Sequence, residues 1–507
     1  MLRLTRKRRN QQGFALIYVT LMGAFLLIPM AGLAVDFGML YNIKARLQTA
    51  CDAAAIGAGY MLHASTNLND PTQYASITNA AQRYFNANYP THYFGSTIAS
   101  YSAVPASSTS GKTITVTASA NVPMLLMRVL GITQSTVGAM AISNVRYISM
   151  MIVVDRSGSV TGEGASSIIQ SALTTFVATS SSSYMVDGTD TVGMVSFGGQ
   201  WKLDYSPNTH FQSSTPNIGT AINNIPFDSN SSTNTTEGLY QAWYQLYQMN
   251  LPGALNVIVL LTDGRPSAFT SYWTPKSSSS CSSKIQRAGV FETYVSLGSY
   301  PYWPPPTSPN ESTGLYATQY TSTPETSNLA ASSAGCAYNS NTANVANDFT
   351  SSAFPNSVGP VDNVGSGSGY PPGFSTAGTG LSTQTGYYST GGNSMTNPKM
   401  GRYAAFNAAD NLAKLIRQDT TLSPMLFVIG LHYSNTSTEP PDDDWLARVA
   451  NDPNYVTVGS DSSHVAAGQT VYQTGQTPGM YCSTDNTLSG LNTCFQQVTS
   501  HLLRLTM

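Results

Sequence analysis

Two apolar segments that each end in an aspartate constrain the fold of this chain most. Residues 150–154 form a continuous apolar run that leads into Asp155-Arg-Ser-Gly-Ser, and residues 256–261 lead into Thr262-Asp-Gly. An apolar run without alternation is typical of a strand that is buried on both faces of a parallel sheet. The two segments therefore predict two central strands, each with polar residues at its carboxyl end.

Helical patterns separate these strands from further ones. Apolar residues recur at helical spacing in two stretches, Ile169, Ala172, Leu173 and Phe176 in the first and Leu239, Ala242, Trp243 and Leu246 in the second. Residues 191–197 and 425–430 predict further strands, and residues 404–416, 443–450 and 488–503 predict helices. Strands that alternate with helices predict an α/β domain with a doubly wound parallel sheet, here over residues 146–505.

One strand assignment has an alternative. Residues 290–297 could supply the later strand of the sheet in place of residues 425–430. We favour residues 425–430 because their apolar run is stronger and because it leads into the terminal helices.

A long segment without regular periodicity interrupts this domain at about residues 268–398. No Lys or Arg occurs between Arg287 and Lys399, and Pro, Gly, Ser, Thr, Asn and Tyr dominate the segment. Such a composition offers little apolar surface for a core of its own. We expect an insertion that is loop-rich or partly disordered.

The N-terminus combines a basic segment with a stretch that carries no charge. Five basic residues lie within residues 1–12, and the 22 residues 14–35 contain no charged side chain. A membrane-spanning helix needs about 20 apolar residues, and a basic flank stays in the cytoplasm. We therefore predict a cytoplasmic tail over residues 1–12, a single transmembrane helix over residues 13–35, and a periplasmic or extracellular location for the rest.

This stretch has two other interpretations. A cleaved secretory signal is less favoured, because the apolar stretch exceeds the roughly 7–15 residues of a signal-peptide core and no small-x-small cleavage site follows it. Gly13-Phe14 after the basic residues resembles the cleavage junction of type IV prepilins, although Tyr18 stands where pilins usually have Glu. The sequence leaves open whether this junction is processed.

Residues 36–145 predict a small α+β module on a stalk helix. An apolar stripe at helical spacing follows the uncharged stretch, formed by Leu40, Ile43, Leu47, Ala50 and Ala54. Residues 113–118 and 137–142 alternate as half-buried strands do, and residues 124–130 predict a short helix.

The overall charge argues against a nucleic-acid partner. Charged residues make up 9% of the chain, and the formal net charge is −2. No basic surface of the kind that binds nucleic acid is implied. A hydroxyl-rich and tyrosine-rich chain with few charges is more typical of an extracytoplasmic protein than of a cytosolic enzyme.

All five cysteines follow the predicted membrane span, where an oxidising compartment permits disulfides. Cys482 and Cys494 are close in sequence, and Cys281 and Cys336 flank the loop-rich region, so these are the pairings that we favour. Cys51 is left over, either buried or available for an intermolecular bond.

Polar residues that follow the central strands predict a metal site. Asp155, Ser157 and Ser159 come directly after one strand, Asp263 follows another, and Thr233 opens a predicted helix. In open α/β sheets, ligands bind at the carboxyl ends of the strands, where the strand order reverses. Hydroxyl and carboxylate oxygens suit a divalent cation such as Mg²⁺, Ca²⁺ or Mn²⁺. The alternative is that Asp and Ser merely cap helix N-termini.

These residues carry a family resemblance. Residues 148–265, resumed at about 400–505, resemble a von Willebrand factor A (vWA) domain. Asp155, Ser157, Ser159, Thr233 and Asp263 match the metal-ion-dependent adhesion site of that family. The resemblance implies a bound divalent cation, most often Mg²⁺, with an acidic group from a protein partner completing its coordination.

The N-terminus resembles a second family. Gly13-Phe-Ala-Leu, Gly32-Leu-Ala-Val-Asp and Ala45-Arg-Leu-Gln-Thr-Ala-Cys-Asp-Ala-Ala-Ala are similar to the TadG-type proteins of Flp (tight adherence) pilus assembly. Arg128-Val-Leu-Gly-Ile and the terminal Leu503-Arg-Leu-Thr fit the same group. Cys51 departs from the alanine-rich run that is usual there.

Together the patterns predict a non-enzymatic, membrane-anchored component of a Tad/Flp-type pilus assembly or adhesion system. Its expected partners are pilus or secretion components, or a surface ligand, bound through the metal. A free-standing surface adhesin is one alternative. A structural pseudopilin-like subunit, whose N-terminal helix packs in a filament, is another. The scattered histidines and glycine-rich runs offer no hydrolase triad and no phosphate loop.

Overall fold

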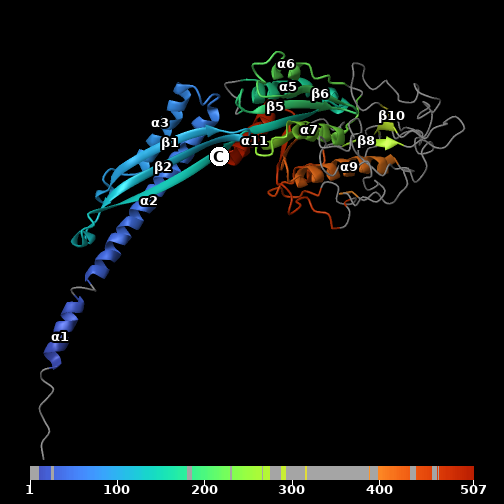
Figure 1. The fold of residues 1–507 in the computed structure, drawn as a ribbon. Helices are drawn as coiled ribbons and strands as arrows, with labels where there is room; N and C mark the ends of the chain where they lie inside the picture. The colour runs from blue at the N-terminus through green and yellow to red at the C-terminus, as the bar shows by residue number, and fades with distance from the viewer. Residues whose placement is uncertain are drawn as a thin grey trace, which may run out of the picture. The chain divides into compact units, whose positions relative to one another are not determined.

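The computed structural model describes the chain in separate ranges, namely residues 11–23, 28–179, 185–228, 231–264, 266–273, 287–292, 315–316, 387–388, 398–433, 441–459, 465 and 468–506. The chain divides into two compact units, Met1–Val145 and Arg146–Thr506. Figure 1 shows both units as a ribbon.

The first unit is an α+β module. Its elements are the helices α1 (Gln11–Met22), α2 (Ile28–Ala64) and α3 (Pro71–Asn88), the 3-10 turns η2 (Tyr93–Gly95) and η3 (Met127–Leu130), and the strands β1 (Thr97–Ser107), β2 (Gly111–Pro123) and β3 (Gln134–Arg146). The strands form one sheet in the order β1-β2-β3. The predicted helix and both predicted strands are present, while the helix expected at 124–130 is the shorter η3.

The core of this unit lies between α2, α3 and β2. The stripe that predicted the stalk helix is buried from Ile43 to Ala54, and it packs with Phe85 of α3 and with the inward residues of β2, which are Ile114, Val116, Ala118, Ala120 and Val122. Helix α3 and strand β1 are not among the elements that the sequence patterns predict. Helix α3 has a clear start signal, because Pro71 is its first residue and the Asp70 side chain accepts a 2.8 Å hydrogen bond from the Thr72 N–H.

The predicted transmembrane helix falls partly outside the described residues. Helix α1 covers Gln11–Met22, and α2 begins at Ile28. Among the helices that the structure describes, none is both long enough and apolar enough to cross a membrane. The span over residues 13–35 therefore stays a prediction.

The second unit is built on a six-stranded sheet. In sheet order its strands are β12 (Met480–Asp485), β11 (Met425–His432), β7 (Leu255–Thr262), β4 (Ile148–Asp155), β5 (Thr191–Phe197) and β6 (Trp201–Asn208). All neighbours pair in parallel except β5 and β6, which are antiparallel. The expectation of an all-parallel sheet is thus wrong at this edge, because β5 and β6 are joined by a tight turn, and a short connection returns the chain antiparallel.

Helices cover both faces of this sheet, as Figure 1 shows. One face carries α5 (Ser166–Leu173), the π-helical turn η4 (Thr174–Ala178), α6 (Ile218–Asn223) and α11 (Leu488–Thr506). The other face carries α7 (Thr235–Met249), α9 (Pro398–Gln418) and α10 (Asp443–Ala450). Alternate residues of one strand enter opposite cores, so that Ile152 of β4 faces the first layer and Val153 the second. This double burial explains why the central strands are uniformly apolar in sequence.

The later strand of the sheet is the one that the sequence analysis favoured. Strand β11 pairs with β7 on one side and β12 on the other. The competing region contributes β9 (Arg287–Glu292), which lies between β8 (Ala268–Trp273) and β10 (Leu315–Tyr316) in a separate antiparallel sheet. Most of the predicted insertion at 268–398 lies outside the described residues.

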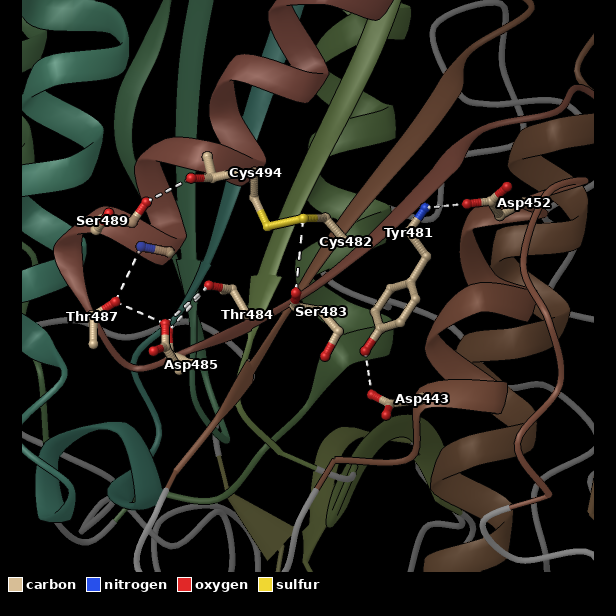
Figure 2. Close-up of a disulfide and its surroundings, with 12 residues drawn as sticks. Asp443, Asp452, Tyr481, Cys482, Ser483, Thr484, Asp485, Thr487, Ser489 and Cys494 are labelled. Carbon is tan, nitrogen blue, oxygen red and sulfur yellow. Dashed lines mark hydrogen bonds between the residues drawn. A yellow bond between two sulfur atoms is a disulfide. The ribbon is translucent and has the colours of Figure 1, made fainter.

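A disulfide ties the last strand to the last helix. Cys482 of β12 and Cys494 of α11 are bonded, with Cα atoms 5.8 Å apart, and Figure 2 shows the bond in place. The predicted pairing is confirmed. Closing so short a loop stabilises the fold by about 3 kcal/mol. Cys51 is a buried free thiol, and the predicted Cys281–Cys336 pair lies outside the described residues.

Candidate metal centre

The five predicted site residues gather at one edge of the six-stranded sheet. Strands β4 and β7 are parallel neighbours, and Val154 pairs with Leu261, so both strands end at the same level. The chain places β5 on one side of β4 and β7 on the other. The strand order therefore reverses at this point, where α/β sheets bind ligands.

Asp155 is the last residue of β4 and is fully buried. Its Oδ1 accepts a 2.9 Å hydrogen bond from the N–H of Ser157, and its Oδ2 accepts a 2.6 Å hydrogen bond from the Thr262 hydroxyl of β7. The first contact shapes the loop that carries the serines, and the second joins the two strand ends. The carboxylate is thus fixed in place by both strands.

A chain of side-chain hydrogen bonds links the serines to the second aspartate. The Oγ atoms of Ser157 and Ser159 are 3.1 Å apart. The Ser159 hydroxyl then donates to Oδ1 of Asp263 over 3.0 Å. Residues that are 104 positions apart in the sequence therefore meet, as the motif spacing predicted.

Thr233 joins this group through the space beside Gly264. A Cβ atom at Gly264 would lie 3.7 Å from the Ser159 Oγ and 3.8 Å from the Thr233 Oγ1, so both hydroxyls border the same small volume. The Thr233 backbone is anchored twice to Ser267. Its N–H donates to the Ser267 Oγ over 3.0 Å, and its carbonyl accepts from the Ser267 N–H over 2.9 Å.

Helix capping does not account for the side chains of Ser157 and Thr233. Ser157 precedes the short helix α4 (Gly158–Gly162), but its side chain makes no capping hydrogen bond. Helix α7 is capped by Asn234, whose side chain accepts from the N–H of Glu237, and not by Thr233. The hydroxyls of Ser157 and Thr233 therefore point to a different use.

Burial gives the two carboxylates unusual electrostatics. Removal from water raises the pKa of Asp155, although hydrogen bonds from Ser157 and Thr262 oppose the shift. Burial, together with the negative charge of Asp155, raises the pKa of Asp263 well above its ordinary value. Two adjacent buried carboxylates repel one another, and a cation between them would remove that cost.

Tyr433 is a site residue that the sequence analysis missed. It follows β11 directly, and its hydroxyl donates a 2.7 Å hydrogen bond to Oδ2 of Asp263. Burial and the nearby charge of Asp263 raise the pKa of this phenol. Its position after an apolar strand at the same sheet edge was the available signal. The separation of 170 residues hid it.

The donor set fits a hard divalent cation. It consists of two carboxylates and three hydroxyls, all oxygen, which is the chemistry that Mg²⁺, Ca²⁺ and Mn²⁺ prefer. In the part of the chain that the structure describes, no group of three or more His, Cys, Asp or Glu side chains is arranged to hold a metal. This centre differs from such clusters because hydroxyls supply most of its donors.

Two parts of the chain match known protein families. Residues 149–296 match the von Willebrand factor type A domain family, and residues 13–62 match the Flp pilus-assembly TadE/G-like family. Both resemblances in the sequence are thereby confirmed. The sheet extends beyond the first match, because β11 and β12 lie after residue 296. No curated protein matches the sequence.

Similar solved structures include pilus proteins. The PilB minor pilin from Streptococcus sanguinis aligns at 13% identity and a TM-score of 0.34, over 81% of this chain and 79% of that one. The vWF domain of the type V pili tip protein Mfa5 from Porphyromonas gingivalis aligns at 13% identity and 0.31, over 72% and 97%. Proximal thread matrix protein 1 from the mussel byssus, with a zinc-occupied MIDAS motif, aligns at 10% identity and 0.28, over 70% and 47%.

Proposed function

Because a vWA domain and a TadE/G-like segment occur in one chain, we propose that this protein is a membrane-anchored, extracytoplasmic component of a Tad/Flp-type pilus assembly or adhesion system. It binds a protein partner through a divalent cation held by Asp155, Ser157, Ser159, Thr233 and Asp263. The two matched families are those of adhesion and structural proteins, and we assign the chain no catalytic role.

The observation that carries this proposal is the convergence of buried oxygen donors from three separate segments. Asp155 and Asp263 are 0% exposed, and Thr233 is 5% exposed. Burying ionised carboxylates without a counter-charge is unfavourable, so a cation bound among these oxygens would lower that cost. A divalent cation supplies that charge and satisfies the hydroxyl oxygens.

The same geometry would leave the bound cation accessible to a protein partner. Gly158 and Ser159 are partly exposed, whereas Asp155 and Asp263 are fully buried. With only two negative ligands, the cation keeps affinity for another anionic oxygen. An Asp or Glu side chain of the partner would approach over Gly158 and complete the coordination.

Titration of the full-length protein in detergent micelles with Mg²⁺, Ca²⁺ and Mn²⁺ tests the metal site. Wild-type protein should bind at least one ion at millimolar concentration or below. Asp263→Asn, which removes charge but little volume, should abolish the signal. Asp187→Asn is the matched control, since Asp187 bonds Gln212 and Ser213 away from the site. Absence of binding by the wild-type protein would refute the proposal.

A structural, pseudopilin-like subunit is the second candidate. The TadE/G-like match covers the N-terminal helices, and α1 exposes Ile17, Val19 and Leu21, which filament packing would bury. Mass measurement of the mature N-terminus in a host that has a prepilin peptidase distinguishes the two. Cleavage after Gly13 favours the filament subunit, and an intact N-terminus favours the anchored component.

A further inference from the structure

A loop in the first unit exposes large apolar side chains. The 124–132 loop connects β2 to β3 and includes η3. Its exposed fractions are 62% for Leu125, 46% for Leu126, 87% for Val129 and 45% for Ile132. Four large apolar side chains exposed within eight residues form a patch of the kind that marks an interaction site.

This loop is fixed to α2 by a buried aspartate. Asp36 accepts hydrogen bonds from three successive backbone N–H groups, those of Leu125, Leu126 and Met127, at 2.9, 3.0 and 2.7 Å. The carboxylate satisfies the free donors at the start of η3. These hydrogen bonds therefore fix the position of the loop against α2.

The loop lies beside the end of the uncharged stretch. At about 1.5 Å per residue, the 22 residues 14–35 would extend about 33 Å if the predicted span were helical throughout, close to the ~30 Å hydrocarbon core of a bilayer. Asp36 is the first charged residue after it. Leu126 reaches one turn further back, because a Cβ on Gly32 would lie 2.8 Å from the Leu126 Cβ.

We propose that the 124–132 loop inserts into the outer leaflet of the membrane that holds the anchor. The inference rests on the anchored topology of the proposed function. If residues 14–35 span the bilayer, Leu126 lies level with Gly32, inside the apolar layer. Helix α2 presents Leu33, Val35 and Phe37 as exposed side chains at the same level. Arg128 is exposed within the loop and suits the phosphate groups of lipids.

Lipid accounts for the loop better than a protein partner does. The patch is continuous with the predicted span, since Leu126 packs at Gly32 within it. The contacts with Asp36 also lower the cost of placing a charge at the membrane boundary, because three N–H donors hydrogen-bond the carboxylate. The loop would then set the depth and rotation of α2 where it leaves the bilayer.

Photo-cross-linking of the full-length chain tests this inference. A diazirine amino acid is placed at Val129, at Tyr18 in the predicted span, or at Ile142, which is exposed on β3. The protein is reconstituted in vesicles of phosphatidylcholine and phosphatidylglycerol. We expect lipid adducts at Tyr18 and Val129, several-fold above those at Ile142.

The other outcomes separate the two proposals. Lipid adducts at Tyr18 without them at Val129 would overturn the loop inference and leave the anchor standing. Loss of adducts at both positions would overturn the anchor, and the loop inference with it. Adducts from Val129 to a second copy or to another protein would show a protein interface and overturn the inference, as would equal lipid labelling at Val129 and Ile142.

A matched pair of glycine variants tests the docking geometry. Gly32→Val should clash with Leu126, displace the loop and lower the lipid adducts at Val129 several-fold, with those at Tyr18 unchanged. Gly38→Val adds the same side chain to the same helix, where nothing lies within 4 Å. It should leave labelling at Val129 unchanged. Equal labelling in both variants would contradict the docked arrangement.

Discussion

Asp36 in the first unit and Asp263 in the second are both buried aspartates, with exposed fractions of 1% and 0%. Burial raises the pKa of Asp36, but the N–H groups of Met127, Leu125 and Leu126 outweigh it, and the net shift is downward. Asp263 receives two hydroxyl donors and faces Asp155, and its pKa is raised. The Asp36 carboxylate is stabilised by backbone donors of its own unit. The Asp263 carboxylate is the one that a cation would stabilise under the proposed function.

The largest expected effect is the loss of metal binding when either site aspartate is removed. Asp155→Ala and Asp263→Ala should each lower divalent-metal affinity more than about 100-fold, since ligand loss exceeds the 10–100-fold typical of outer contacts. The double variant should lose little more, because both residues serve one ion. Isothermal titration measures this. Independent, additive losses would indicate two ions.

The variant Asp36→Ala tests whether Asp36 and Asp263 act independently of one another. It removes the acceptor for three backbone N–H groups and should lower the thermal stability of the first unit. Metal affinity should remain that of the wild type. A loss of metal binding in this variant would show that the two aspartates are not independent.

Tyr433→Phe should give an intermediate effect. The variant loses only the hydroxyl that donates to Oδ2 of Asp263. Metal affinity should fall about 10-fold, at the low end for outer contacts that orient a ligand. Tyr205→Phe is a control, since that hydroxyl bonds Ser214 away from the site. Equal affinity of the Tyr433 variant and the wild type would remove Tyr433 from the site.

The pH dependence of stability should have opposite signs in the two regions. The lowered pKa of Asp36 stabilises the fold above its ordinary value of 3.8, and this contribution is lost as pH falls through the folded-state pKa. The raised pKa of Asp263 makes the metal-free protein lose stability as pH rises from 3.8 through the folded-state value. Thermal melts of wild type, Asp36→Asn and Asp263→Asn between pH 3 and pH 7, without metal, measure both slopes.

Saturating Mg²⁺ gives the smallest and most specific change. A bound cation should abolish the decline of stability with rising pH that Asp263 causes, and leave the acid-side loss from Asp36 unaltered. The same melts repeated with Mg²⁺ and with a chelator show this. A metal effect of equal size in Asp263→Asn would place the ion elsewhere.

The central strands and the site residues could be predicted because their signals are local. A strand that is buried on both faces is apolar along its length. Asp155 is the last residue of β4 and Asp263 directly follows β7, so the two aspartates mark the ends of those strands. The edge strands gave no such signal. Strand β6 is buried only at Trp201 and Tyr205 and carries Lys202 and Asp204, and β12 contains Ser483, Thr484 and Asp485.

The sequence by itself therefore determined the α/β pattern, the polar residues at the ends of the central strands and the Cys482–Cys494 pairing, because each depends on residue type and short spacing. Only the tertiary structure decided that β6 runs antiparallel, that Tyr433 reaches Asp263, and that Asp36 holds the 124–132 loop. The contacts of Asp36 and Tyr433 join residues about 90 and 170 positions apart in the sequence. The direction of β6 depends on its pairing with β5. No local sequence pattern encodes these tertiary contacts, because they arise from the packing of the whole chain.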